Sequence, residues 1–431
     1  EIPQGDWSSD VCSSDLPSRL LKAMEDSLRE ENKELKERIE ELEKEVERCK
    51  TELSKFKESA RYQLQQLREY NDSLNEQLRR VGDGFIKEDD GVAEDMVEEV
   101  ERFKSVVYSP LVDPPKYVEK HCFSSVHSSN ILCVTFWNDN DLFLFSSDVT
   151  NRLACINTCD GSVVCESKLS APCCSLAVVK DGSLLLAGCM DGLLHVFSIE
   201  TANYVITALT KKSQHKLHTK AILKLRACDS LGLVASTSYD NTVSLFALNA
   251  DGTVKEKSRF YFKYTCDGIA FCPKHNAFIV SERNQPFMNY IDLDTQEKRE
   301  VSINNHEWDS HVSFCITDLL PLHDEDYLLA LTDKGNVVVY SYGRNAHVMV
   351  VYSGSMLSDS YYNGVLVADR EEKCVFTICP DNTIRVYSLY TGKEVSVLKG
   401  HSKTIRNMSC CGNEIATCSY DHSIRVWSKC V

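Results

Sequence analysis

Long apolar runs are missing from this chain of 431 residues. No stretch of 18 or more consecutive apolar residues occurs, which excludes a membrane-spanning helix. An excess of positive charge is missing as well, because 64 acidic residues outnumber 48 lysines and arginines and leave a formal net charge of -16. A protein that holds nucleic acid by general attraction to phosphate needs a basic face, so the composition argues against that class.

The motifs of the common catalytic and metal sites are also missing. The chain has no phosphate-cradling GxxxxGKS or GxxxxGKT loop, no GxSxG nucleophile turn and no HExxH metal pair. The sequence therefore predicts a protein without a catalytic site, a cofactor or a metal ion.

Cysteine is plentiful, at 20 residues, but no Cys-x-x-Cys pair occurs. The nearest groupings are Cys155 with Cys159 and the vicinal pairs 173–174 and 410–411, which are poor ligand sets for structural zinc. The cysteines are scattered among apolar runs in a long chain, which favours reduced thiols packed in a core. We therefore expect a protein of the cytosol or the nucleus.

The first sixteen residues do not read as evolved protein sequence. They lack a starting methionine and any periodic apolar pattern, and the stretch DWSSDVCSSDL resembles the translation of a sequencing adapter. We interpret residues 1–16 as a non-native artefact and leave them out of the fold analysis. On this interpretation the natural N-terminus lies outside the chain.

Residues 17–81 carry a heptad pattern. Nine d positions begin at Leu21 and nine a positions begin at Glu25, and seven of each nine are apolar. Such a sustained seam predicts a coiled coil. The seam residues that matter most are Asn32, Leu35, Ile39, Leu42, Val46 and Leu53.

The chemistry of the seam favours two parallel strands. Beta-branched residues occupy a, leucine occupies d, and Asn32 is the kind of polar a residue that fixes register. Four g to e pairs between partners would join opposite charges: Glu31 with Lys36, Arg38 with Glu43, Glu45 with Lys50, and Glu52 with Lys57. A single solvated helix with its own i,i+4 pairs is the alternative. We expect a parallel homodimer.

An acidic connector follows at residues 82–115. Nine acids against three basic residues between 82 and 104 give this stretch a net charge of -6, and prolines 110, 114 and 115 impose an extended chain. We interpret the segment as a solvated linker; an acidic interaction motif is the alternative.

Residues 116–431 contain seven copies of a unit that ends in a tight turn and a strand. In order, the units end in SSDVTNRLACIN, GCMDGLLHVFS, SYDNTVSLFAL, SERNQPFMNYID, LTDKGNVVVYS, CPDNTIRVYS and SYDHSIRVWS. Six have an aspartate at the turn, at positions 148, 191, 240, 333, 381 and 421, and the fourth has Glu282, Arg283 and Asn284 there.

These repeats resemble those of the WD-repeat family, whose units are four-stranded blades arranged in a ring. The resemblance implies a mainly β fold, a seven-bladed propeller, and the heptad pattern places a long parallel coiled-coil helix before it. The last unit is nearest to the family pattern, and the resemblance implies that its His401, Thr417, Ser419, Asp421 and Trp427 form a buried structural set. Elsewhere the set is expected to be degraded, since serine replaces the second residue of the Trp-Asp pair in most units.

The last unit ends after its third strand, so closing the ring requires one more strand. We expect residues 117–123, which precede the first unit, to supply it and to remove the open sheet edge.

Two surfaces are candidates for partner binding. The first is a basic run, expected as a loop between the second and third units, with Lys211, Lys212, Lys216 and Lys220; a solvated loop is the alternative. The second is aromatic, with Trp308, Tyr361 and Tyr362 in loops that enter the fifth and sixth units, where packing between blades is the alternative.

The predicted function is a non-catalytic homodimeric scaffold that presents a propeller to other proteins and assembles complexes. Two alternatives share the order of a coil followed by a propeller. One is the substrate-recognition part of a RING-containing ubiquitin ligase, and the other is an autophagy or membrane-trafficking adaptor. The sequence names no partner.

Overall fold

The computed structural model describes residues 99–107, 115–302 except 139 and 250, 315–342 except 324 and 325, 346–351 and 364–430. In the N-terminal part it describes residues 22, 29, 33, 35, 36, 38–48 and 50, all of them helical. The chain divides into two compact units, Glu1–Ala93 and Glu94–Val431. Among the described helices, none has the length and apolar character that crossing a membrane requires.

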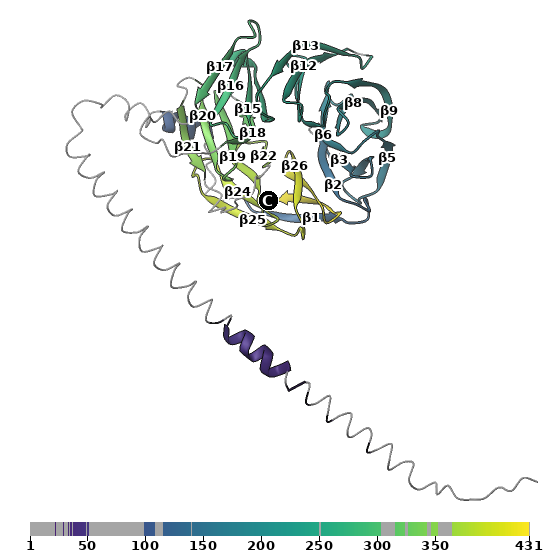
Figure 1. Cartoon of the computed structure of the whole chain (residues 1–431). Helices are drawn as coiled ribbons and strands as arrows, with labels where there is room; N and C mark the ends of the chain where they lie inside the picture. The colour runs from purple at the N-terminus through teal and green to yellow at the C-terminus, as the bar shows by residue number, and fades with distance from the viewer. Residues whose placement is uncertain are drawn as a thin grey trace, which may run out of the picture. The chain divides into compact units, whose positions relative to one another are not determined.

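The second unit is built from seven four-stranded antiparallel sheets (Figure 1). The first four blades are β2 (Ile131–Trp137), β3 (Asn140–Asp148), β4 (Arg152–Asn157) and β5 (Val163–Lys168); β6 (Cys173–Val179), β7 (Leu184–Cys189), β8 (Leu193–Ala202) and β9 (Val205–Lys216); β10 (Ile222–Cys228), β11 (Leu233–Ser238), β12 (Thr242–Leu248) and β13 (Val254–Tyr261); and β14 (Cys266–Cys272), β15 (Ala277–Glu282), β16 (Phe287–Asp292) and β17 (Lys298–Ser302). A short 3-10 helix, Pro273–His275, joins β14 to β15.

The remaining three blades complete the circle. They are β18 (Ile316–Pro321), β19 (Tyr327–Thr332), β20 (Val337–Ser341) and β21 (Ala346–Val351); β22 (Leu366–Ala368), β23 (Cys374–Ile378), β24 (Thr383–Ser388) and β25 (Glu394–Lys399); and β26 (Ile405–Cys411), β27 (Glu414–Ser419) and β28 (Ile424–Lys429) together with β1 (Tyr117–Phe123).

The first strands of the blades form the inner wall of the ring. Each contacts the first strand of the next blade, from β2 through β6, β10, β14, β18 and β22 to β26, and β26 contacts β2 again. Because this series returns to its start, the seven sheets form a closed propeller, as the repeats predict (Figure 1).

In the six blades whose fourth strand has described side chains, burial falls from the second strand to the fourth. Every residue of β7, β15, β19, β23 and β27 is buried, and their sequences are correspondingly rich in valine, leucine, isoleucine and alanine. The outer strands β5, β13 and β25 mix polar and apolar residues and are mostly exposed or half-buried. Packing between neighbouring blades therefore provides the core.

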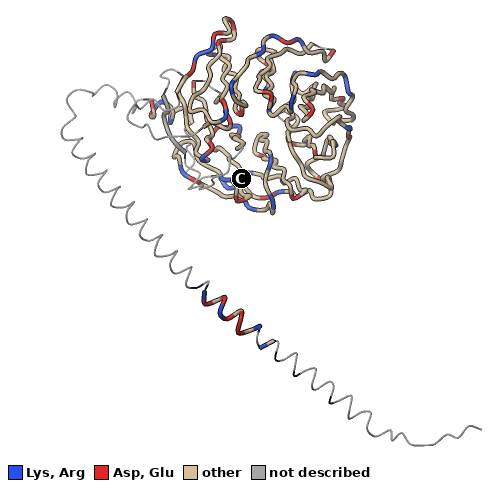
Figure 2. The backbone as a smooth tube through the Cα atoms, in the orientation of Figure 1, with Lys and Arg blue, Asp and Glu red and all other residues tan. Residues whose placement is uncertain are grey.

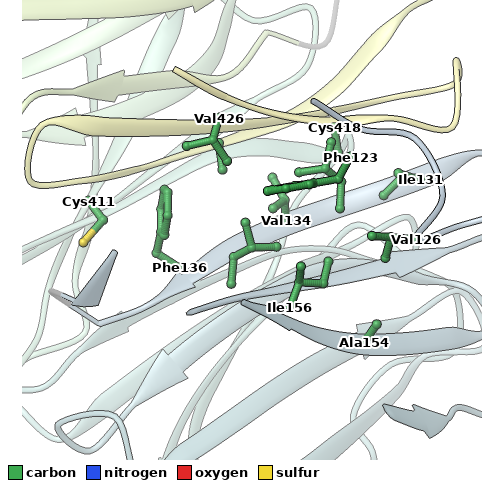
Figure 3. Packing of buried hydrophobic residues seen from close by; sticks show 13 residues of the cluster. Phe123, Val126, Ile131, Val134, Phe136, Ala154, Ile156, Cys411, Cys418 and Val426 are labelled. Atoms are coloured by element: carbon green, nitrogen blue, oxygen red, sulfur yellow. The ribbon is translucent and has the colours of Figure 1, made fainter. Parts of the chain in front are cut away.

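The ring closes through β1, as the sequence predicts. β1 runs antiparallel to β28, from Tyr117 opposite Lys429 to Phe123 opposite Ile424. Phe123 also enters the core between the seventh and first blades, where Figure 3 shows it beside Val134 and Val426. One strand thus supplies both the edge hydrogen bonds and part of the apolar contact that join the ends of the ring.

Part of the expected linker is packed on the propeller. Residues 99–106 are helical, and Glu99, Phe103 and Val107 are buried. The Phe103 ring meets the Tyr327 ring edge to face at 5.0 Å, and the hydroxyls of Tyr327 and Ser341 donate to Glu99 Oε1 at 3.1 and 2.8 Å. The interpretation of a solvated linker is therefore wrong for residues 99–107, because one face of this helix is apolar although the segment is acidic.

The predicted coiled coil lies mostly outside the described residues, Asn32 and Leu53 included. Residues 38–48 are helical, and acidic and basic side chains are interspersed along them, with the acidic ones in excess (Figure 2). The seam residues Leu35, Ile39, Leu42 and Val46 are 46–56% exposed in the single chain. Pairing between two chains stays a prediction.

The packing of Phe103 yields a test of the 99–106 helix. We expect Phe103→Ala to lower the free energy of unfolding of the second unit by about 3–5 kcal/mol, because it empties a buried aromatic site. Urea unfolding followed by tryptophan fluorescence measures this change. Val106→Ala is the matched control, since Val106 lies on the same helix but is 42% exposed. Equal midpoints for the two variants would contradict the packing.

Candidate functional site

One end of the ring, here named the turn face, carries the tight turns between the second and third strands of the blades. An aspartate at the turn accepts the backbone N–H two residues further on in five blades. The pairs are Thr150 with Asp148 at 2.8 Å, Leu193 with Asp191 at 3.0 Å, Thr242 with Asp240 at 3.1 Å, Thr383 with Asp381 at 3.1 Å, and Ser423 with Asp421 at 3.0 Å. In the fifth blade Asp333 instead accepts the N–H of Cys315 at 3.1 Å.

The seventh blade holds the polar set that the sequence places there. His401 Nδ1 lies 2.9 Å from Asp421 Oδ2, and His401 Nε2 lies 2.8 Å from Thr417 Oγ1. Trp427 Nε1 donates to the same Thr417 oxygen at 3.0 Å, and Ser419 Oγ donates to the carbonyl of Lys403 at 2.9 Å. Because a carboxylate only accepts, Nδ1 carries the proton and Nε2 accepts from Thr417.

The first and third blades keep the histidine, hydroxyl and aspartate of this set but have Ile156 and Phe246 in place of the tryptophan, so the expected degradation is only partial there. His127 Nδ1 lies 2.7 Å from Asp148 and its Nε2 2.7 Å from Ser146 Oγ. His218 lies 3.2 Å from Asp240 and 2.8 Å from Ser236 Oγ. The missed signal is the separation of 20–22 residues between histidine and turn aspartate, which is shared by all three blades.

In two further blades the acidic residue at the turn is hydrogen-bonded by other partners. In the second blade Ser170 Oγ lies 2.6 Å from Asp191 and 2.8 Å from His195 Nε2, with the histidine supplied by β8. In the fourth blade Glu282 accepts the backbone N–H groups of Lys263 and Tyr264 at 3.0 and 3.1 Å. The longer glutamate therefore replaces the aspartate that the fourth repeat lacks.

Burial and hydrogen bonding fix the charge states of these sets. Burial lowers the pKa of His127, His218 and His401 below its ordinary value, so each is neutral near pH 7. Burial alone would raise the pKa of Asp240 and Asp421, but hydrogen bonds from Thr242 and Ser423 and from backbone N–H groups lower both to about 2. A neutral histidine locked between two partners suits a structural role.

A cavity of about 610 Å³ lies within the inner wall. Its lining comes from the first strands of six blades, β2, β6, β10, β18, β22 and β26, and from turn-face residues such as Met190 and Tyr239. The cavity is therefore the channel of the ring, open toward the turn face.

Three cations and one carboxylate line this channel. Lys224 Nζ and Arg226 Nη2, both from β10, lie 2.8 and 3.2 Å from Asp318 Oδ1 on β18. Burial lowers the pKa of Lys224. Burial alone would raise the pKa of Asp318, but the charges of Lys224 and Arg226 hold it below its usual range. Asp318 is thus shared by two cations, and it is the one carboxylate among the described residues that line the channel.

Arg406 on β26 is the third cation, and its contacts differ from those of Lys224 and Arg226. Its Nε is buried and finds no hydrogen-bond partner among the described residues. Arg385 and Arg425 also have an orphaned Nε, but they form ion pairs with Glu394 and Glu119, whereas the described residues offer Arg406 no ion pair. The Arg406 guanidinium lies 5.7 Å from the centre of the Tyr420 ring. Among the described residues, Arg406 is therefore a cation at the channel to which no carboxylate is paired.

We name Met190, Tyr239, Arg406 and Tyr420 the channel mouth. Met190, Tyr239 and Tyr420 each directly precede the turn aspartate of their blade, and Met190 and Tyr239 are 44% and 46% exposed. The Arg283 guanidinium lies 5.7 Å from the Tyr239 ring while binding Asp267 through two hydrogen bonds. Sequence reasoning missed this group; the signal was the large side chain immediately before the turn aspartate.

The predicted basic loop is mostly a strand. Lys211, Lys212 and Lys216 lie in β9, the outer strand of the second blade, and only Lys220 lies in the connection to β10. The Lys211 ammonium donates to Gln214 Oε1 at 2.7 Å, and that of Lys216 donates to the carbonyl of Asp191. An outer strand exposes much of both faces and so lacks the apolar alternation that would have identified it. Trp308, Tyr361 and Tyr362 lie outside the described residues.

Comparison with known proteins agrees with this geometry. The family model described as WD domain, G-beta repeat matches residues 153–198 and 392–428. The first match begins in β4 and ends in β8, and the second runs through β26, β27 and most of β28. A search of curated proteins finds no match.

The buried histidines predict acid sensitivity. A histidine whose folded pKa is lowered stabilises the fold fully above its unfolded pKa of about 6.5. This stability is lost as the pH falls below that value, because the unfolded chain binds the proton first. We therefore expect the urea midpoint to fall between pH 7 and pH 5, with a further loss below pH 4 as Asp240 and Asp421 protonate in the unfolded chain.

A matched pair of variants assigns the first step. We expect His401→Gln to be less stable at pH 7 and to have a shallower slope between pH 7 and pH 5. His323→Gln should keep the slope of the unchanged protein, because the side chain of His323 is 74% exposed. Identical slopes for all three proteins would contradict the assignment to His401.

Proposed function

This chain is a seven-bladed propeller that contains WD40 repeats, and we propose that it is a non-catalytic scaffold that binds acidic peptide segments of other proteins at its channel mouth. WD40 propellers are generally interaction modules, and a closed ring of packed blades suits that role. The observation that carries the choice of surface is the excess of cations over carboxylates among the described residues that line the channel.

Charge supports an acidic ligand. The chain as a whole is acidic, at -16, yet the channel collects three cations around one carboxylate. A side-chain carboxylate or phosphate that reaches Arg406 would supply the missing counter-charge, and hydrogen bonds to an ionised partner are the strong ones. A basic peptide would have to approach the same cations and is disfavoured.

The neighbouring side chains support a peptide rather than a free ion. Tyr420 lies beside the cation, with its ring centre 5.7 Å from the guanidinium, and Tyr239 and Met190 line the same cavity with large, partly exposed side chains. Aromatic residues and arginine are the types that contribute most to binding at protein interfaces. A segment that places an acidic residue at Arg406 and an apolar residue against Tyr239 or Met190 uses both features.

We further propose that the N-terminal helix pairs two chains in parallel. Leu35, Ile39, Leu42 and Val46 form an apolar row at heptad spacing, exposed in the single chain. Two propellers on one paired helix would bind a partner with two acidic segments more tightly than one propeller does. A scaffold of the cytosol or nucleus is the leading version of this proposal, ahead of a ubiquitin-ligase component or a trafficking adaptor.

The first test separates the channel mouth from β9. Fluorescence anisotropy would measure the binding of a labelled peptide rich in glutamate with one phenylalanine, and of its lysine counterpart. We expect only the acidic peptide to bind, and Arg406→Glu to weaken binding at least about tenfold, which corresponds to about 1.4 kcal/mol.

The double variant Lys211→Glu/Lys212→Glu is the control for charge. It adds more negative charge than Arg406→Glu but places it on β9, so affinity should change far less. Tyr204→Ala controls for exposed aromatic surface, since Tyr204 is 88% exposed and lies between β8 and β9, at the other end of the blade from the turn face. Loss of binding in the lysine variant with retention in Arg406→Glu would move the site to β9.

The second test concerns oligomeric state. Multi-angle light scattering of the full chain should give twice the mass of 48.7 kDa. We expect Ile39→Glu/Val46→Glu to give the single-chain mass, because charge at two a positions opposes the seam. Lys44→Glu, two positions from the d residue Leu42 and on the outer face of the predicted coil, should stay dimeric. A single-chain mass for the unchanged protein would refute the pairing.

A further inference from the structure

Two cysteines of the first blade stand directly opposite each other. Cys155 on β4 pairs in register with Cys165 on β5, and both are free thiols. Opposed residues of antiparallel strands have Cα atoms roughly 4.5–5.5 Å apart, and disulfide-bonded cysteines have Cα atoms about 4.4–6.8 Å apart. The backbone therefore already stands at the span of a disulfide, with both side chains on one face of the sheet.

The two thiols differ in access to solvent. Cys155 is fully buried in the core between the first and second blades, in a cluster with Phe145 and Phe197. Cys165 is only half-buried at the edge of that cluster. A small oxidant in water can therefore meet the sulfur of Cys165, whereas Cys155 is screened behind it.

The pKa values of the two thiols differ in the same sense. The contact with Cys155 across the strand pair lowers the pKa of Cys165. The same contact, together with burial, raises the pKa of Cys155. A thiolate is thus favoured at the accessible sulfur and opposed at the buried one, which is the arrangement found at redox-sensitive cysteines.

We propose that Cys165 is a site of oxidation by peroxides and that Cys155 resolves it into a cross-strand disulfide. The Cys165 thiolate attacks one oxygen of hydrogen peroxide, the O–O bond breaks, and a sulfenic acid forms while hydroxide leaves and takes up a proton. The Cys155 sulfur then attacks the sulfenic sulfur, and the sulfenic hydroxyl leaves with the thiol proton as water. Two thiols are oxidised, one peroxide is reduced, and two waters are released.

The second blade contains an internal control. Cys173 on β6 and Cys189 on β7 are also directly opposed, so their backbones have the same spacing. Both are completely buried, and burial raises the pKa of Cys173. If opposed register alone decided the chemistry, both pairs would oxidise. If access and thiolate character decide it, only the pair on β4 and β5 reacts under native conditions.

Oxidation would act on the contact between two blades. Cys165 and Val164 on β5 pack with Leu209 on β9, in the cluster shared by the first and second blades. The disulfide would tie β5 to β4 beside this contact, so the packing of β5 against β9 would respond to the oxidation of Cys165.

The test uses the full chain without substitution. Reduced protein is treated with hydrogen peroxide at neutral pH, remaining thiols are alkylated, and a non-reducing digest is mapped by mass spectrometry. We expect a cross-linked peptide that joins Cys155 to Cys165, with the loss of two free thiols per chain, while Cys173 and Cys189 are recovered alkylated after denaturation.

Variants test the order of events. Cys155→Ala should accumulate a dimedone-reactive sulfenic acid at Cys165, and Cys165→Ala should show no sulfenic acid at Cys155. A thermal melt of each variant verifies folding, and the mapping of the unchanged chain stands without either of them. Recovery of Cys165 as free thiol after peroxide, or a Cys173–Cys189 disulfide that forms equally fast, would overturn the proposal.

Discussion

The antiparallel pairing of β1 with β28 is the interaction on which the closed ring depends. Without β1 the seventh blade would have three strands, and β28 would leave a row of unpaired backbone groups at an open edge. The pairing is reinforced by ion pairs between Arg425 and Glu119 and between Lys120 and Glu414. It also brings Phe123 into the core between the last and first blades. Every surface formed by several blades, the channel included, exists only because this strand closes the circle.

The polar sets of the turn face follow from burial within this closed ring. A buried histidine or aspartate without a partner costs about 1–3 kcal/mol, so each blade must satisfy whichever polar residues it buries. This requirement explains why His127, His218 and His401 keep both hydrogen bonds although the repeats have diverged. The second position of the Trp-Asp pair is less constrained. Its serines at 198, 388 and 428 are half-buried, so the residue type there can change without leaving a buried charge unpaired.

The sequence repeats made most of the ring predictable. Features that depend on contacts between distant parts of the chain were not predictable. Seven turn signals in phase predict seven blades, and a missing last strand predicts the closing role of residues 117–123, because both follow from local pattern and from edge satisfaction. The pocket for Phe103 was not predictable, since Tyr327 lies more than 200 residues further along the chain. The strand β9 was mistaken for a loop because its outward position removes the apolar period. The sets around His127 and His218 were missed because their signal is a spacing and not a dipeptide.

The channel mouth was not predictable from the sequence either, because its residues come from different blades. Met190, Arg406 and Tyr239 belong to three blades and share one cavity only after the ring has closed. Within the described parts of the ring the other charged groups of the channel are paired, as Lys224 and Arg226 are with Asp318. Arg406 differs from them, because no described carboxylate pairs with it. Pairing within the described fold therefore accounts for Lys224 and Arg226 but not for Arg406, and this difference is the reason for placing the proposed acidic ligand at Arg406.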